Sequence, residues 1–398
     1  MSALHCSPPP ADLPPDHVFQ EVLLHLPPDP SFLLAASLVC KRWRRLVRNP
    51  AFLRRFRAFH RTPPVLGFFQ NIWTLSCLPA QGKRIRFVPT ASPAARISPP
   101  PGFLGLVLDC CHGRVLLYSY SNKELLVWDP MTGGTRYVSA PTDLVGEDVA
   151  AALLCAAAHG DHSDCHSSPF QIIFLDCKED DECQVSACVY SSETDAWASW
   201  TAITTPSLVC SDSSTLVGNS VYWNIDFAEE DSNHILQFEL CSQRLGLIEL
   251  PEGVRENYMS DIHVMLAEDG GVGFAGVNYS SIHLWSRRID SEGVAGWALL
   301  RIIDMDRLTL SGAPTEDMFL WSSVVAFDRD SDELFLQAEG GIFMINVSSM
   351  QLRKVLEASG SAIYPYASFY TRGTILQRLI ILMYVFGGYM DCRTLLFF

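Results

Sequence analysis

The feature that most constrains this chain is a run of similar strand and turn units between Gly113 and Glu357. In each unit an apolar segment rich in β-branched and aromatic residues leads into a short polar turn, and a second such segment follows. The turns recur about every 45–65 residues, close to the period of β-propeller blades of four short strands. A blade buries its faces only by packing on neighbouring blades, so the units must fold together. The five units are Gly113–Pro141, Gln184–Trp200, Gly218–Pro251, Gly270–Ile303 and Asp332–Glu357.

This pattern predicts a large all-β domain, propeller-like, over residues 104–370, with room for a sixth unit between Phe68 and Gly113. A β-sandwich is the alternative architecture. Residues 61–103 are rich in proline near both ends, and we expect a connecting segment or first irregular strands there.

The end of the sequence, residues 371–398, lacks these turn signals and is predicted to be an atypical hydrophobic tail. Its uncharged stretch, Leu379–Met390, has twelve residues, whereas a membrane span needs about 20. We therefore expect no stable membrane insertion.

The first sixty residues are helical in pattern instead. Val18, Val22 and Leu26 recur at helical spacing. Asp29-Pro30 is typical of a helix start and Asn49-Pro50 of a helix end. A helical wheel sets an apolar arc opposite a basic arc in the last part of this stretch, which predicts one amphipathic helix. The apolar arc holds Val39, Cys40, Trp43, Leu46 and Val47, and the basic arc holds Lys41, Arg44, Arg45 and Arg48.

A module of two or three helices in about 45 residues buries little surface. Its apolar positions exceed what such helices can hide, and exposed apolar area indicates a protein interface.

The residues of this module resemble an F-box in order and spacing. The matching positions are Leu13-Pro14-Pro15-Asp16, Glu21-Val22-Leu23, Leu26-Pro27, Leu33, Ser37-Leu38-Val39-Cys40-Lys41-Arg42-Trp43-Arg44, Leu46-Val47, Pro50 and Phe52. The resemblance implies a small all-α domain of three helices, residues 10–60, that docks on the adaptor subunit of an SCF-type cullin–RING ubiquitin ligase. The adaptor-binding residues and supporting core that it implies are Leu13, Pro14, Val22, Leu23, Leu26, Val39, Cys40 and Trp43.

An F-box followed by this β pattern is similar to plant F-box proteins with an F-box-associated, propeller-like or kelch-like, β domain. That resemblance implies a substrate-recognition subunit that contacts the cullin through the adaptor and binds a target protein, of unknown identity, through the β domain. Ubiquitin transfer would take place on other subunits, so the chain itself would not be an enzyme. The alternative is a ligand-binding propeller, lectin-like or enzyme-like, with an incidental helical cap.

The distribution of charge argues against a nucleic-acid partner. Residues 1–61 carry nine basic and four acidic residues, and the rest of the chain carries 20 and 40. Phosphate contacts depend on Lys and Arg, and the basic arc lacks the Asn and Gln side chains that recognise bases. We interpret the basic arc as a solvated face or an electrostatic aid to partner docking.

Two clusters could in principle carry chemistry. His159–His166 places six potential metal ligands in one short loop, whereas structural zinc sites usually use two separated pairs. Cys110, Cys111 and His112 are adjacent, and neighbouring strand residues point to opposite faces. No nucleotide-binding or hydrolase motif accompanies them. We therefore expect no catalytic residue, metal or cofactor, and we expect the tryptophans to be blade core. These are Trp197, Trp200, Trp223, Trp285, Trp297 and Trp321.

The thirteen cysteines are irregularly spaced, and the N-terminal residues show no signal-peptide pattern. Both observations favour a reducing compartment, so we expect the cytoplasm, the nucleus or both.

Overall fold

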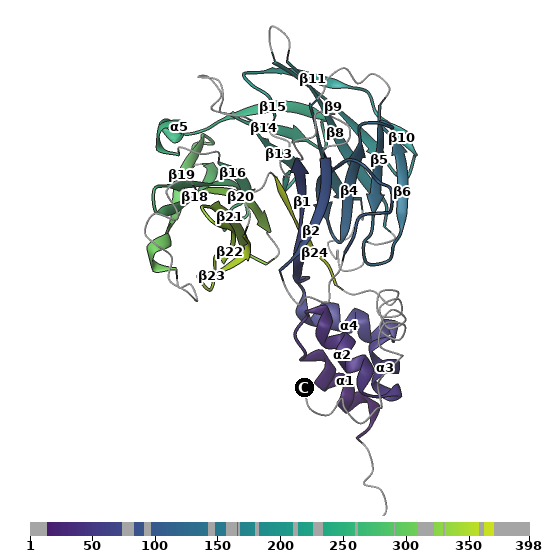
Figure 1. The fold of residues 1–398 in the computed structure, drawn as a ribbon. Helices are drawn as coiled ribbons and strands as arrows, with labels where there is room; N and C mark the ends of the chain where they lie inside the picture. The colour runs from purple at the N-terminus through teal and green to yellow at the C-terminus, as the bar shows by residue number, and fades with distance from the viewer. Residues whose placement is uncertain are drawn as a thin grey trace, which may run out of the picture. The chain divides into compact units, whose positions relative to one another are not determined.

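In the computed structural model, the chain divides into one unit of Met1–Arg61 with Phe369–Phe398 and a second unit of Thr62–Ser368 (Figure 1). The structure describes residues 14–73, 83–90, 97–141, 148–156, 165, 168–179, 183–209, 214–225, 234–258, 262–289, 291–308, 322–328, 331–357 and 362–369. The predicted hydrophobic tail therefore lies outside the described residues.

The described part of the first unit contains four helices, so the prediction of three was wrong. They are α1 (Asp16–Leu24), α2 (Pro30–Val39), α3 (Lys41–Val47) and α4 (Pro50–His60). Asn49-Pro50 was correctly expected to end a helix, but it also starts one. The Asn49 side chain accepts a hydrogen bond from the Ala51 N–H at 2.8 Å, and Pro50 occupies the first turn, where its missing N–H costs nothing.

The single amphipathic helix predicted around Cys40 is also wrong. Cys40 is extended, with φ −160° and ψ 167°, and its Sγ accepts a hydrogen bond from the Trp43 N–H at 3.4 Å. A side chain that satisfies a free N–H in this way caps a new helix. The break changes the helical phase, so Val39 is 64% exposed while Leu46 is buried.

The four helices share one hydrophobic core, against which Phe19, Leu26 and Trp43 pack as half-buried side chains. Each large apolar side chain that is fully buried in this core contributes roughly 1.5–3 kcal/mol to the stability of the fold. The buried members are Leu23, Leu24, Leu33, Ala36, Leu46, Val47, Phe52, Leu53 and Phe56.

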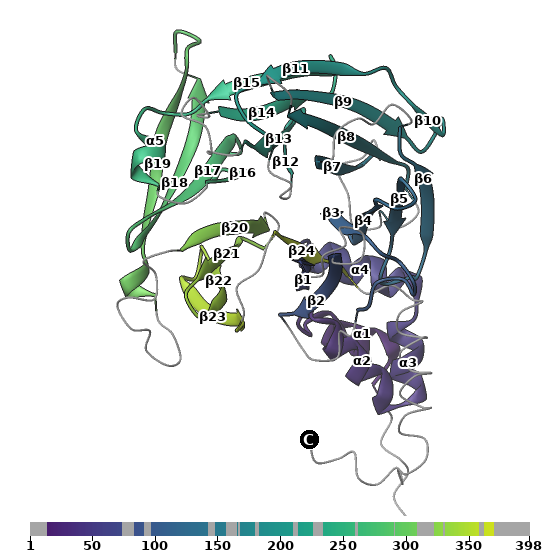
Figure 2. The same ribbon diagram turned by 45° about the horizontal axis from the view of Figure 1, so that its top comes forward.

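The second unit is a six-bladed β-propeller, and Figure 2 shows its sheets around a central axis. This arrangement confirms the propeller prediction over the β-sandwich. The first blade consists of β3 (Leu106–Cys111), β4 (Arg114–Ser119), β5 (Glu124–Trp128) and β6 (Thr135–Ser139). The second consists of β7 (Asp148–Cys155), β8 (Phe170–Glu179), β9 (Cys183–Ser191), β10 (Ala196–Trp197) and β11 (Thr201–Thr205). The third consists of β12 (Thr215–Val217), β13 (Ser220–Asn224), β14 (His234–Glu239) and β15 (Arg244–Glu249). The next two are β16 (His263–Leu266), β17 (Val272–Asn278), β18 (Ser281–Ile289) and β19 (Ala295–Asp304); and β20 (Ser323–Asp328), β21 (Glu333–Ala338), β22 (Gly341–Asn346) and β23 (Gln351–Leu356). The short helices α5 (Val254–Asn257) and η2 (Met305–Arg307) follow β15 and β19.

The sixth blade closes the ring with strands from both ends of the unit. It consists of β1 (Val65–Trp73), β2 (Lys83–Pro89) and β24 (Ile363–Ala367), in the order β2-β1-β24. Strands β1 and β24 pair antiparallel, with Gln70 opposite Ile363. Two of these strands thus lie in residues 61–103, for which we predicted a connecting segment or first irregular strands.

A hydrophobic cluster lies between each of five pairs of successive blades, as blade stacking requires. Trp223 is fully buried in one of them, and four further tryptophans pack against the clusters as half-buried side chains. These four are Trp197, Trp200, Trp285 and Trp297, and Trp321 lies outside the described residues.

Candidate functional site

The first candidate site is the set of exposed apolar side chains on the helical unit. On α2, Phe32, Leu38 and Val39 are 44%, 41% and 64% exposed. At about 100° per residue, Phe32 and Val39 lie on one helix face two turns apart, and Leu38 lies about 120° around the helix from Phe32. On α1, Val18 and Val22 are 39% and 52% exposed and lie one turn apart. Within the part of the unit that the structure describes, these side chains lie outside the hydrophobic core, and exposed apolar area of this kind is typical of a binding surface.

The predicted adaptor-binding residues separate into two groups. Pro14, Val22, Val39 and Cys40 are exposed, whereas Leu23 is fully buried and supports the core. Two others are half-buried against the core, where the Trp43 ring packs edge-on against Phe19 at 5.9 Å between centroids. These two are Leu26 and Trp43, and Leu13 lies outside the described residues.

Sequence reasoning missed the exposed Phe32, Leu38 and Phe59. Phe32 shares a helix face with Val39 at positions i and i+7, but the prediction of one continuous helix through Cys40 obscured this pairing. Phe59 stands edge-on to the ring of His25 at 5.0 Å, a contact between α4 and the end of α1 that the sequence does not reveal.

The basic residues of α3 are engaged at the start of α1. The Asp16 carboxylate accepts from the Arg42 Nε at 2.5 Å and from the Arg45 Nη2 at 3.0 Å, and Arg42 also donates to the Pro14 carbonyl at 2.7 Å. The hydrogen bond from Arg42 is the main reason why the pKa of Asp16 is lowered. Two of the basic side chains of α3 thus hold Pro14 and Asp16 at the start of α1.

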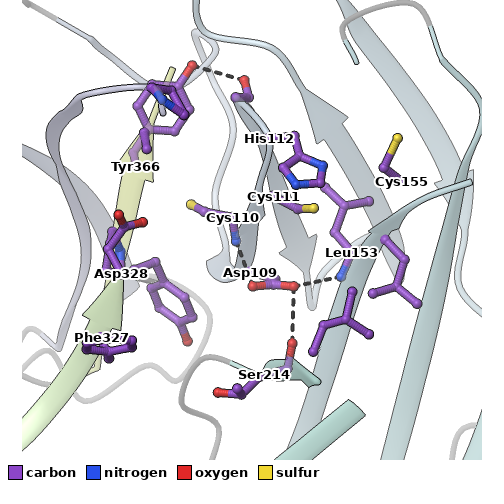
Figure 3. Close-up of a pocket in the computed structure, with 18 of the residues that line it drawn as sticks. Asp109, Cys110, Cys111, His112, Leu153, Cys155, Ser214, Phe327, Asp328 and Tyr366 are labelled. Carbon is purple, nitrogen blue, oxygen red and sulfur yellow. Dashed lines mark hydrogen bonds between the residues drawn. The ribbon is translucent and has the colours of Figure 1, made fainter. Parts of the chain in front are cut away.

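The second candidate site is a pocket of about 340 Å³ along the central channel of the propeller (Figure 3). Its walls come from the innermost strands of the blades, β3, β7, β12, β16, β20 and β24. Apolar rings such as Phe327, Tyr364 and Tyr366 line it together with the polar side chains of Asp109, His112 and Ser214.

Buried polar side chains tie neighbouring blades together around this channel by accepting hydrogen bonds from the innermost strand of the next blade. Asn71 accepts from the Val107 N–H at 2.9 Å, and Asn224 accepts from the Val264 N–H at 3.1 Å. Asp109 takes the same role between the first and second blades, because its Oδ2 accepts from the Leu153 N–H at 2.7 Å. These bonds make the channel wall a structural network, and no local sequence pattern announces it.

The carboxyl group of Asp109 has an unusual environment. It also accepts from the Cys110 N–H at 2.8 Å and from the Ser214 hydroxyl at 3.3 Å, as Figure 3 shows. Burial raises the pKa of Asp109 to about 7, and these three hydrogen bonds oppose that rise. Near neutral pH this group therefore holds its proton in the folded protein for part of the time.

The neighbouring thiols are not activated nucleophiles. Burial raises the pKa of both Cys110 and Cys111 well above the ordinary value, which keeps them protonated at neutral pH. The other predicted cluster, His159–His166, lies outside the described residues except for Cys165.

Exposed apolar residues of the propeller gather on its fourth blade. Ile289 at the end of β18 is 75% exposed, and Leu299 and Ile302 on β19 are 40% and 56% exposed. Strand β19 is the outermost strand of its sheet, so its outer backbone groups have no partner within that sheet.

Comparison with known proteins joins the two units in one family. Residues 12–55 match the F-box domain, and residues 106–370 match the family described as F-box protein AT5G49610-like, beta-propeller. Because the second match spans more than half of the chain, the protein belongs to this family of F-box proteins with a β-propeller.

Two relatives of the chain come from a plant. The putative F-box protein At3g17265 of Arabidopsis thaliana is 22% identical over 321 residues, which cover 76% of this chain and 81% of that protein. The F-box/kelch-repeat protein At3g17530 of the same plant is 25% identical over 250 residues, 61% of each chain. Among solved structures, a protein from Bacteroides caccae aligns at 9% identity over 75% of this chain and 99% of that chain, with a TM-score of 0.39.

None of the helices among the described residues combines the length and the apolar character needed to cross a membrane.

Proposed function

We propose that this protein is the substrate-recognition subunit of an SCF-type ubiquitin ligase. The observation that carries the proposal is the set of exposed apolar residues on α1 and α2 of an F-box whose described hydrophobic core does not include them. In this function the helical unit binds the adaptor subunit, and through it the cullin, while the propeller holds the target protein. Ubiquitin is transferred by other subunits, so the chain contributes proximity rather than catalytic groups.

The proposed adaptor contacts are Val22, Val39 and Cys40, with Pro14 at their edge. Leu23 and Trp43 belong to the supporting core, so truncation of either tests folding as much as binding. Lysine in place of Val22 or Val39 is the better perturbation. Both residues lie in the last turn of a helix, where a positive charge is tolerated by the helix dipole, while a covered site would have to bury the ammonium group.

For the target we propose contact with the fourth blade. An outermost strand with exposed apolar side chains can pair with an extended segment of a partner and offer pockets to alternate side chains. The kelch-repeat relative also supports a kelch-like relation of this propeller. As compartment we propose the cytoplasm or the nucleus, where thiols stay reduced, because the cysteines that the structure describes are all free.

The test is co-purification of the full chain with the adaptor subunit and capture of bound targets. We expect Val39→Lys to lose the adaptor and keep its targets, and Ile302→Lys to do the reverse. Retention of the adaptor by Val39→Lys, with the propeller folded, contradicts the proposed docking surface.

The second candidate function is a ligand-binding propeller, which the channel pocket of about 340 Å³ favours. This function predicts that a small molecule bound in the pocket raises the melting temperature of the full chain, with a shift that saturates as its concentration rises. The same shift should be found in Val39→Lys, the variant expected to lose the adaptor.

A further inference from the structure

The structure brings together three potential metal ligands from two blades that the sequence keeps apart. The Sγ of Cys155 lies 3.3 Å from the Sγ of Cys165, which lies 3.8 Å from the Nδ1 of His112. All three ligand atoms lie within 4.8 Å of one another. One residue comes from each of the two local clusters in the sequence, and Cys155 belongs to neither.

The position of His112 is fixed by its hairpin. Cys111 pairs with Arg114, so His112 and Gly113 form a two-residue turn between β3 and β4, with φ of 45° and 79°. Two positive φ angles are typical of the type I′ turn, which follows the twist of the strands. The buried Tyr366 hydroxyl donates to the Gly113 carbonyl at 2.9 Å and holds this turn against β24, as Figure 3 shows.

The two cysteines are held by the neighbouring blade. Cys155 is the last residue of β7 and is paired with Phe170. The buried Arg114, which directly follows the His112 turn, donates to the carbonyl of Cys165 and to that of Ser168, the latter at 2.6 Å. The same hairpin thus presents the imidazole and anchors the backbone that carries the Cys165 thiol.

The donor set matches one kind of ion. Cysteine thiolates and imidazole nitrogens bind Zn²⁺ at about 2.3 and 2.0–2.1 Å, and a tetrahedral arrangement then places its sulfur atoms about 3.8 Å apart. The two sulfur atoms lie 3.3 Å apart, about 0.5 Å short of this spacing, and the Cys165 Sγ lies 3.8 Å from the His112 Nδ1, so small side-chain rotations bring the three donors onto one ion. Hard cations such as Mg²⁺ and Ca²⁺ prefer oxygen ligands instead.

We propose that His112, Cys155 and Cys165 bind one Zn²⁺ ion, which links the first and second blades. The three side chains supply three of the four positions of a tetrahedral ion. His112 and Cys155 also line the channel pocket, so the ion lies at the edge of that pocket and its fourth position can accept a water molecule or a donor atom of a bound molecule. This site is independent of adaptor binding and adds a metal to a chain for which sequence reasoning expected none.

The test measures zinc bound to the full chain. Protein purified under a reductant that does not bind metal is loaded with Zn²⁺, dialysed and analysed by atomic mass spectrometry. We expect one zinc per chain in the native protein, and a loss of that zinc in Cys155→Ser, Cys165→Ser and His112→Ala. The matched control is Cys241→Ser, because Cys241 is exposed and lies on another blade, and it should retain the ion.

A second readout uses Co²⁺ in place of Zn²⁺. Thiolate-to-cobalt charge-transfer absorption, together with intense visible bands of a tetrahedral ion, should appear in the native protein and in Cys241→Ser but not in Cys165→Ser. Circular dichroism establishes that each variant is folded. A folded native chain without stoichiometric zinc, full zinc in Cys165→Ser, or a Cys155–Cys165 disulfide found by peptide mass spectrometry in the zinc-loaded protein would each overturn the site.

Discussion

Replacement of Asp109 by asparagine should remove one identifiable part of the pH dependence of propeller stability. Asp109 has an ordinary pKa of 3.8 and a pKa of about 7 in the folded protein because it is buried. Between these values the folded chain holds a proton that the unfolded chain releases. The stability that this group contributes is therefore fully present below pH 4 and is lost as the pH rises through 7. Between pH 5 and pH 7 the free energy of unfolding should fall by about 1.36 kcal/mol per pH unit, and above pH 7 this fall levels off. The expected loss of stability from pH 5 to pH 8 is therefore about 3 kcal/mol.

Asparagine can keep the bond that matters most here. Asn71 and Asn224 already accept from a neighbouring inner strand as Asp109 does, so an amide oxygen at position 109 can accept from the Leu153 N–H. The bond from the Cys110 N–H is lost, at a cost of about 1–3 kcal/mol. The variant should be less stable than the native protein at pH 5, and its relative stability should improve by about 3 kcal/mol by pH 8.

The assay is urea unfolding of the full chain at pH 5, 6, 7 and 8, followed by tryptophan fluorescence of the propeller transition. Comparison of variant with native protein cancels the titration of all other groups. Asp195→Asn is the matched control, because Asp195 is exposed and its pKa is lowered, mainly by the hydrogen bond from Tyr190, so it stays ionised across this range. A stability difference for Asp109→Asn that stays flat within about 0.5 kcal/mol from pH 5 to 8 refutes the reasoning.

Three further predictions concern single side chains. Burial lowers the pKa of His263 to about 4, so the stability that this group contributes is present above pH 6.5 and is lost as the pH falls through 4, the opposite direction to that of Asp109. The urea unfolding midpoint of His263→Asn should therefore change less than that of the native protein between pH 6.5 and pH 4. Leu23→Ala should destabilise the helical unit by about 2–5 kcal/mol because Leu23 is fully buried, whereas Val22→Ala should change the stability of that unit by less than about 0.5 kcal/mol. Hydrogen exchange of the α1 amides measures both changes, and equal effects of the two substitutions would contradict the burial argument. Tyr366→Phe leaves the buried Gly113 carbonyl without this donor and should cost about 1–3 kcal/mol by urea unfolding, and no loss means that water replaces the hydroxyl.

The propeller could be predicted from the sequence because each blade repeats the same local pattern of strands and turns. Each of the five units falls in a different sheet. The room left for a sixth unit between Phe68 and Gly113 holds most of β1 and all of β2, but the third strand of that blade, β24, comes from the other end of the unit. The pairing of β1 with β24, by contrast, joins Gln70 to Ile363, and no local signal connects residues so far apart.

The helical unit shows how a small local feature can shift a prediction. The apolar period through Cys40 favoured one continuous helix, but the thiol competes for the Trp43 N–H and starts a new helix. Asn49-Pro50 has two meanings at once, since it can stop one helix and cap the next. Exposure of Val39 and burial of Leu23 follow from tertiary packing, which the motif alone could not distinguish.

The cluster of His112, Cys155 and Cys165 could not be predicted from the local sequence either, because tertiary packing creates it. Cys155 belonged to no cluster in the sequence, and His112 and Cys165 belonged to different ones. Only the packing of β3 beside β7, with Arg114 fixing the loop that carries Cys165, brings the three side chains together.

The affinity of the full chain for the purified adaptor subunit, measured by isothermal titration calorimetry, tests the central claim most directly. We predict a saturable one-to-one complex and no detectable binding by the double variant Val22→Lys, Val39→Lys. Ile289→Lys, at an apolar position of the propeller that is more exposed than either valine, should bind with native affinity. Absence of binding by the native chain, or native affinity in the double variant with its helices intact, would contradict the account.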